Sequence, residues 1–133
     1  DIDLNYEELR PYSQLVREIS GIQVPSNRPI VGDTIFDMEA GIITDWYKNV
    51  GEDHFLEVFP FVPELVGHER EQIILGKKSG RASIDLWLDR IEVDVDNEER
   101  AEILQQVKAK GIERKGPITE LDFRAIVDEV TTS

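Results

Sequence analysis

The spacing of apolar residues along this chain predicts a mainly helical protein. In the first segment, Asn5 and Glu8 form the pattern of a capping box, and the helix that they open runs to Ser20 and stops at Gly21. The apolar positions of this helix recur every three or four residues and are predicted to form one buried face: Leu9, Tyr12, Val16 and Ile19.

The most apolar stretch extends from Asn27 to Trp46 and predicts a second helix. Asp33 or Thr34 is the expected N-cap, and the helix ends near Asn49. Two adjoining apolar stripes cover nearly half of its circumference: Phe36, Ala40, Ile43 and Tyr47, and Ile35, Met38, Ile42 and Trp46. This helix is expected to be buried on two sides, either at the centre of a small helical core or against another subunit or domain. Gly41, between the stripes, indicates a close approach of another backbone.

Two segments that contain prolines are predicted not to be helical. Ile22 to Val31 contains Pro25 and Pro29, which push their preceding residues towards extended backbone, so an ordered strap is expected there. Phe55 to Pro63 combines aromatic residues with two prolines, which disfavours both a helix interior and a central strand. It is expected to be a loop that either folds over its own core or presents an apolar patch to a partner.

The second half of the chain predicts three further helices. One is capped by Ser79 and runs through Ile91, the next opens with a capping box at Asp96 and runs to Lys110, and the last opens at Thr119. Their expected buried positions are Ile84, Leu86, Trp87, Leu88, Ile91, Ile103, Leu104, Val107, Leu121, Phe123, Ile126 and Val127.

These elements define a mainly α fold with little or no strand. We expect two small helical subdomains, a helix-and-strap unit over residues 1–67 and a three-helix unit over residues 68–133. A chain of 133 residues is too short to contain a catalytic TIM barrel, which needs about 200 residues at least.

Composition and charge exclude several classes of partner. The chain is 40% hydrophobic and 32% charged, an ordinary balance for a globular domain, and its formal net charge is −13. Nucleic acid and anionic membranes are excluded as partners, because both would meet like charge. There is no cysteine, no apolar run of about 18 residues and no signal sequence, so we expect a cytoplasmic protein.

Several ordered blocks of sequence resemble a known family. They are Asn27 to Gly32, Phe36, Glu39 to Ile42, Pro63 to Gly67 and Leu75 to Arg81. Together they resemble the region that follows the catalytic barrel in the isopropylmalate, homocitrate and citramalate synthases, which are related to HMG-CoA lyase. The resemblance implies a transferase of amino-acid biosynthesis, an acyltransferase that condenses acetyl-CoA with a 2-oxo acid. Its metal-containing TIM barrel is absent from this chain.

The resemblance also implies which residues lie near the chemistry. Glu39 and Asp45 match acidic positions of the subdomain that, in this family, reaches the active-site mouth of the partner subunit. The family places a catalytic histidine where this chain has Ile43, which neither carries a proton nor donates a hydrogen bond. We therefore expect a homodimer or a partner TIM-barrel domain, with acetyl-CoA at the interface, and no catalysis by this chain alone.

The residues themselves offer one weak binding site. Lys77, Ser79, Gly80 and Arg81 stand at a predicted helix N-terminus, where they either attract an anion such as part of CoA or form a plain N-cap with basic neighbours. The segment from His68 to Gln72 lacks the second histidine of a zinc-protease motif. No metal site and no cofactor are therefore expected here, and a divalent metal is expected only in the missing barrel.

We expect this chain to be the accessory, dimer-communicating region of a synthase of this kind. The alternative is a separately encoded, non-catalytic interaction or regulatory subunit with the same fold. The sequence does not distinguish between these two alternatives. It also does not show whether the loss of the family histidine abolishes activity. It also leaves the 2-oxo acid of the parent enzyme undetermined, since that pocket lies in the barrel.

Overall fold

A computed structural model describes residues 3–69 and 72–132, and their fold is mainly helical, as expected from the sequence. The described residues form five α-helices, three short 3-10 segments and two parallel strands of two residues each. By contacts the chain divides into two compact units, Asp1–Asp37 with Asp53–Gln72 and Met38–Glu52 with Ile73–Ser133. The predicted domain ranges, 1–67 and 68–133, stay a prediction, since units of contact need not be independent folding domains.

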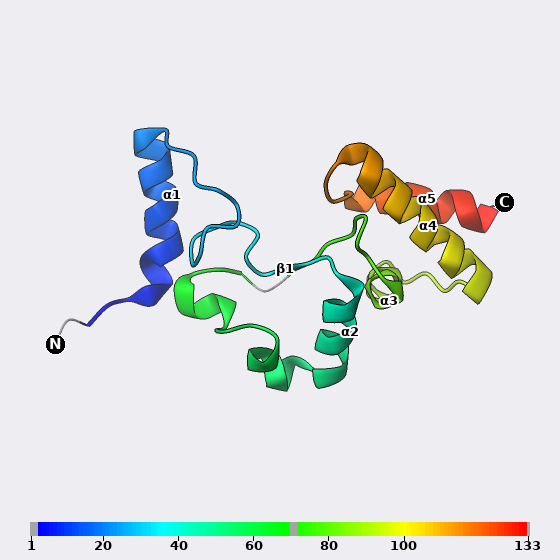
Figure 1. The fold of residues 1–133 in the computed structure, drawn as a ribbon, viewed down its shortest axis with the longest axis horizontal. Coiled ribbons are helices and arrows are strands. Elements are labelled where there is room, and N and C mark those ends of the chain that lie inside the picture. The colour runs from blue at the N-terminus through cyan, green and yellow to red at the C-terminus, as the bar shows by residue number, and fades with distance from the viewer. Residues whose placement is uncertain (1–2, 70–71, 133) are drawn as a thin grey trace. The chain divides into compact units, whose positions relative to one another are not determined.

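In the first unit, the 3-10 segment η1 (Tyr6–Glu8) leads into helix α1 (Leu9–Ser20), drawn in blue in Figure 1. The helix stops where it was predicted to stop, because Gly21 adopts the left-handed conformation at φ 69° and its N–H donates to Arg17 O. At the start, Asn5 caps η1 by accepting from the Glu7 N–H at 3.3 Å. The reciprocal bond of a capping box to Glu8 is not formed among the described residues.

The predicted buried face of α1 is wrong. Tyr12, Val16 and Ile19 are exposed, and α1 buries none of its residues. The strap covers a different stripe, because Arg17 donates to Asp33 Oδ2 at 2.8 Å and to Val31 O at 2.7 Å. Ion pairing and hydrogen bonding therefore attach the strap to a polar side of the helix, and the apolar residues remain on the surface.

The core of the first unit is aromatic and is centred on Phe36. Its ring lies 5.5 Å from the ring of Phe59 and 5.6 Å from that of Phe61, and His68 packs on it edge to face at 5.3 Å. Phe59 also stacks on Phe55 at 4.8 Å. The loop from Phe55 to Pro63 therefore folds over its own core, which was one of its two predicted arrangements. Its first three residues belong to the 3-10 segment η2 (Glu52–Glu57), and its last residue begins η3 (Pro63–Val66).

The second predicted helix begins later than expected. Helix α2 spans Gly41–Val50, while strand β1 (Asp37–Met38) pairs with β2 (Gln72–Ile73). Within the first unit the Gln72 N–H donates to Phe36 O at 3.2 Å, and within the second the Ile74 N–H donates to Met38 O at 3.0 Å. Residues 36–38 thus bury their apolar side chains with the period of a strand, which a helical spacing also fitted.

The second unit is built from α2, α3 (Arg81–Arg90), α4 (Asn97–Arg114) and α5 (Glu120–Thr132), and Figure 1 shows α4 beside α5. Phe123 of α5 is fully buried and meets the Trp87 ring of α3 edge to face at 5.3 Å. The Trp87 Nε1–H donates to Ile73 O at 2.8 Å, so the indole satisfies its polar atom inside the core. The remaining buried core residues are Leu75, Ile84, Leu88, Val95, Ile103, Val107, Ile118, Ile126 and Val127.

Three expectations for this unit need correction. Helix α4 does not end at Lys110 but continues to Arg114, and Lys115 forms its left-handed C-cap at φ 57°. Helix α3 begins at Arg81 with Gly80 as its N-cap, because the Ser79 hydroxyl instead accepts from the Gly76 N–H at 2.9 Å. Leu121, predicted to face inward, is 80% exposed, since it lies on the opposite side of α5 from Phe123.

Candidate functional site

The most structured functional candidate is the turn 76–80, which connects β2 to α3. The Ser79 N–H donates to Gly76 O at 3.1 Å and the Gly76 N–H donates back to Ser79 Oγ, which closes a tight turn. Lys78 is held at both of its backbone groups: its N–H donates to Glu39 Oε1 at 3.0 Å, and its carbonyl accepts from the Gly41 N–H at 3.2 Å. The turn is therefore fixed to the segment that leads into α2.

Glycines permit this turn to lie against two helices. A Cβ at Gly41 would lie 2.6 Å from Gly80 Cα, so the start of α2 touches the N-cap of α3 by backbone alone. The close backbone approach predicted for Gly41 is thereby confirmed. A Cβ at Gly111 would lie 2.7 Å from the Lys77 nitrogen, so α4 also packs directly on the turn. Gly76 leaves room in the same way for the Glu39 carboxylate.

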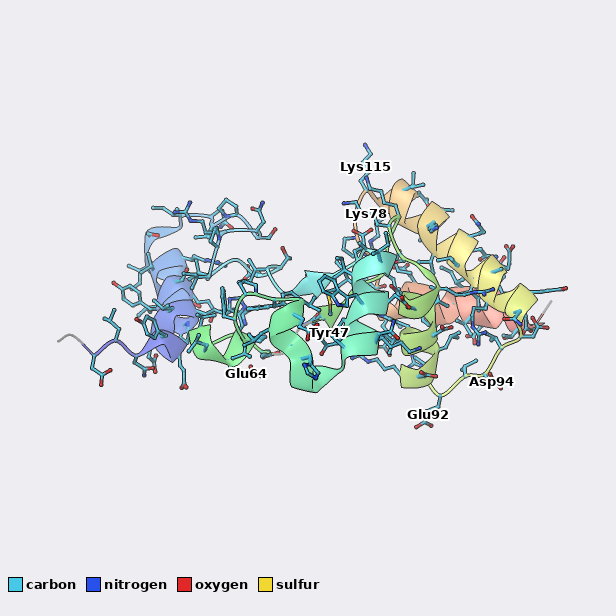
Figure 2. The ribbon with its side chains drawn as sticks, turned by 60° about the horizontal axis from the view of Figure 1, so that its bottom comes forward. Tyr47, Glu64, Lys78, Glu92, Asp94 and Lys115 are labelled. Atoms are coloured by element: carbon cyan, nitrogen blue, oxygen red, sulfur yellow. The ribbon has the colours of Figure 1, made fainter. Side chains whose placement is uncertain are left out.

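Beside the turn lies a pocket of about 360 Å³ within the second unit. It is lined by the turn, by Glu39 and by the last residues of α4: Glu39, Lys77, Lys78, Gly111, Ile112, Lys115 and Gly116. In Figure 2, Lys78 and Lys115 are labelled at this side of the second unit, one from the turn and one from the C-cap of α4. Three lysines thus line one pocket in a chain whose net charge is −13.

The four residues of the predicted anion site have different environments in the structure. Lys77 is exposed and lines the pocket, whereas Ser79 is buried and its hydroxyl accepts from Gly76. Gly80 packs on Gly41, and Arg81 is exposed at the start of α3 but does not line the pocket. Sequence reasoning missed Lys78 and Lys115. The basic run at 77 and 78 was a signal for the first, but nothing local pointed to the second.

The candidate acidic residues occupy different environments. Glu39 is half-buried and accepts the Lys78 N–H, so one of its oxygens serves the turn. Asp45 is exposed on α2, where its Oδ2 accepts from Asn49 Nδ2 at 3.3 Å. Asp37 lies in β1, where burial raises the pKa of its carboxyl. The three carboxylates therefore do not share one helix face.

Helix α2 presents an apolar surface around the position where the resemblance implies a histidine. Ile42 is 84% exposed, Ile43 is 37% exposed and Trp46 is 44% exposed, while Thr44 is fully buried and accepts from the Ser83 hydroxyl at 3.2 Å. Ile43 is thus accessible at the surface and is not enclosed in the core. We call the surface formed by Ile42, Ile43 and Trp46 the α2 face.

Two kinds of site are not found in the described part of the chain. Over residues 3–69 and 72–132, no three His, Asp or Glu side chains gather closely enough to hold a metal ion. Across the same ranges, no helix has the length and apolar character to cross a bilayer. Arg70 and Glu71, which belong to the rejected zinc motif, lie outside the described residues.

Comparison with known proteins identifies the class to which the chain belongs. The family described as "Homocitrate synthase post-HMGL domain-like" matches residues 30–115. This range holds the Phe36 cluster, the α2 face and the turn 76–80, and it ends at the C-cap of α4. The chain therefore belongs to this family, and the resemblance inferred from the sequence is confirmed.

The individual relatives are named as three kinds of synthase. The chain is 39% identical to the putative (R)-citramalate synthase CimA of Methanopyrus kandleri over 98% of its own length and 24% of that protein. It is 39% identical to the homocitrate synthase AksA of Methanocaldococcus jannaschii, over 98% of this chain and 30% of that one. A probable 2-isopropylmalate synthase of Archaeoglobus fulgidus is 34% identical, over 96% of this chain and 25% of that protein. The chain thus spans roughly a quarter to a third of these relatives.

Proposed function

We propose that this chain is the accessory, subunit-contacting region of an acyltransferase that condenses acetyl-CoA with a 2-oxo acid. Its family membership and the printed names of its relatives support the reaction class. One observation supports the contact role: the α2 face leaves Ile42, Ile43 and Trp46 in water on a helix that buries Thr44 on its other side. An exposed apolar surface of this kind is typical of a protein contact.

The occupant that we propose for the α2 face is a second copy of the whole synthase, through its barrel or its own post-barrel region. The dimer was first expected from a longer helix and from the loop 55–63, but Phe36 and Met38 of that stretch are buried. The case for a dimer therefore rests on α2 itself. It is strengthened by α1, whose Tyr12 and Ile19 are also exposed.

Substitution of the α2 face in the full-length protein tests this contact. Ile42→Glu should shift the assembly towards monomer in light scattering across a dilution series, because a charge would have to be buried in the contact. Lys48→Glu on the same helix is the control and should leave the mass unchanged. If Ile42→Glu assembles as the wild type does, the contact role is wrong.

Catalysis is tested at Ile43. The loss of one positioned acid or base typically removes a factor of about 10² to 10⁴ in rate, so Ile43→His in the full-length protein should raise turnover of acetyl-CoA with a 2-oxo acid. The partial exposure of Ile43 allows the imidazole to reach a partner without entering the core. Unchanged turnover of a folded Ile43→His variant would remove the family histidine from this proposal.

Ile43 also favours a second candidate function. Because Ile43 can neither accept nor donate a proton, the chain also suits a non-catalytic interaction or regulatory subunit of the same fold. The two candidates differ in their chemistry. A full-length protein that carries a barrel and consumes acetyl-CoA supports the first, whereas a separately encoded chain that binds a synthase and changes its rate supports the second.

A further inference from the structure

We propose that the pocket lined by Lys77, Lys78 and Lys115 binds the phosphate group of a small phosphate monoester. The pocket is formed within the second unit, and its volume of about 360 Å³ is within the range of small-molecule sites. Glu39 is the one acidic residue in its lining, so the side chains around it carry a net positive charge. This inference does not depend on the accessory role proposed above.

The charge of the pocket opposes the charge of the chain. Acidic residues outnumber basic ones by 28 to 15, and several basic groups elsewhere meet carboxylates, as Arg17 meets Asp33 and Arg100 meets Asp85. In the described part of the chain, none of the three pocket lysines takes part in an ion pair. Like charges around one cavity repel each other, and a bound dianion would relieve that repulsion.

The single carboxylate does not neutralise this charge by pairing with an ammonium group. Glu39 Oε1 instead accepts the backbone N–H of Lys78 at 3.0 Å. That bond holds the Lys78 backbone in place and leaves the Nζ group of its side chain for a ligand. Because the Lys78 carbonyl also accepts from Gly41, the base of this side chain is fixed before any ligand arrives.

Lys115 is fixed from the other side of the pocket. It occupies the left-handed C-cap of α4 at φ 57°, a conformation that glycine adopts at lower cost. Its N–H donates to Ile112 O at 3.2 Å, and the Gly116 N–H donates to Gly111 O at 3.2 Å. These bonds satisfy two of the last four carbonyls of α4, which would otherwise disfavour an anion at a helix C-terminus.

The chemistry of the lining favours phosphate over carboxylate. Lysine ammonium groups act as point charges, and three of them suit a phosphate monoester, which carries a charge of about −1.5 to −2 at neutral pH, better than a single carboxylate. Ile112 adds an exposed apolar wall for the organic part of the ligand. Free phosphorylated metabolites and the 3′-phosphate of CoA share this chemistry, and the CoA source rests on the proposed function.

The test is a titration of the full chain with inorganic phosphate, CoA and dephospho-CoA, followed by ¹⁵N–¹H NMR. Inorganic phosphate should shift the amides of Lys78, Ile112 and Gly116 saturably. CoA binding at least tenfold more tightly than dephospho-CoA would identify the 3′-phosphate as the source. Equal shifts by both would identify a free phosphorylated metabolite. The absence of saturable shifts at these amides would overturn the proposal.

Matched variants separate binding from folding. Lys78→Gln and Lys115→Gln should each weaken phosphate binding roughly threefold, and the double variant about tenfold, while the exposed Lys48→Gln outside the pocket should not. Lys115→Gly should raise the melting temperature, because glycine accepts this φ, and should still weaken binding. Phosphate binding of unchanged affinity in the double variant would overturn the proposal, whereas a failure of the dimer test would not.

Discussion

The imidazole Nε2 of His68 lies 2.7 Å from the carbonyl oxygen of Ile30. Ile30 stands at φ 71°, in the middle of a three-residue turn closed by the Val31 N–H donating to Pro29 O at 2.9 Å. A β-branched residue rarely adopts this conformation, so it is strained. The hydrogen bond from a buried, neutral His68 therefore holds the strap in place against the aromatic core of the first unit.

This contact predicts a dependence of stability on pH. Burial lowers the pKa of His68 below its ordinary value of 6.5, against the opposing effect of its bond to Ile30. The unfolded chain then takes up a proton before the folded chain does, so the free energy of unfolding is highest above about pH 6.5 and falls as the pH drops through the folded pKa. The slope should not exceed about 1.4 kcal/mol per pH unit for this group. Urea unfolding at pH 7.5, 6.5 and 5.5 measures it.

Variants of the two histidines assign the effect. His68→Phe keeps an aromatic ring beside Phe36 but loses the bond to Ile30, so it should cost about 0.5 to 1.5 kcal/mol at pH 7.5 and flatten the slope. His54→Gln is the control, since the His54 side chain is 63% exposed and lies outside the aromatic core. A slope that persists in His68→Phe would mean that other groups cause it.

The close packing of α4 on the turn 76–80 predicts an unusual response to alanine. Gly→Ala inside a free helix gains up to about 1 kcal/mol. Gly111→Ala should instead cost about 1 to 3 kcal/mol, because its Cβ would lie 2.7 Å from the Lys77 nitrogen. Gly116→Ala has open space around its Cβ and should change the free energy of unfolding by less than about 0.5 kcal/mol. Thermal melts of both variants provide the comparison, and a more stable Gly111→Ala would contradict the packing.

Two neighbouring apolar residues of α5 should differ sharply. Phe123 is fully buried against Trp87, so Phe123→Ala should cost about 3 to 5 kcal/mol. Leu121 is 80% exposed, and Leu121→Ala should stay within about 0.5 kcal/mol of the wild type. Chemical denaturation followed by tryptophan fluorescence suits both, because Trp87 reports on this core. Similar losses of unfolding free energy for the two variants would contradict the exposure of Leu121.

The N-cap of α4 gives a fourth matched pair. Asp96 Oδ1 accepts from the Glu98 N–H at 2.7 Å and the Glu99 N–H at 2.9 Å, and Glu99 Oε2 accepts from the Asp96 N–H at 2.8 Å. Asp96→Ala should therefore cost about 1 kcal/mol. Asp94→Ala, two residues earlier on the exposed approach to the helix, should cost far less. Equal melting temperatures of Asp96→Ala and Asp94→Ala would refute the role of the cap.

Several elements could be predicted from the sequence alone because they depend on local hydrogen bonds. The capping box at Asp96 and Glu99, the cap of α5 by Thr119 with Asp122, and the left-handed stop at Gly21 depend on groups within a few residues of each other. These bonds depend little on the rest of the fold, although the box expected at Asn5 and Glu8 does not form. The family was also readable, because its blocks are linear stretches of sequence.

Tertiary structure decided what depends on distant partners. The residues 36–38 have a spacing that suits a helix, but hydrogen bonds of Phe36 with Gln72 and of Met38 with Ile74 make them a strand. Helix α4 continues through Gly111 to Arg114. The glycine serves packing there, because the turn at Gly76 and Lys77 fills the space where a Cβ would lie. The same packing brings Lys115 to the pocket beside Lys78. A pattern of apolar spacing carries no information on which remote backbone will approach, and that approach created the candidate site.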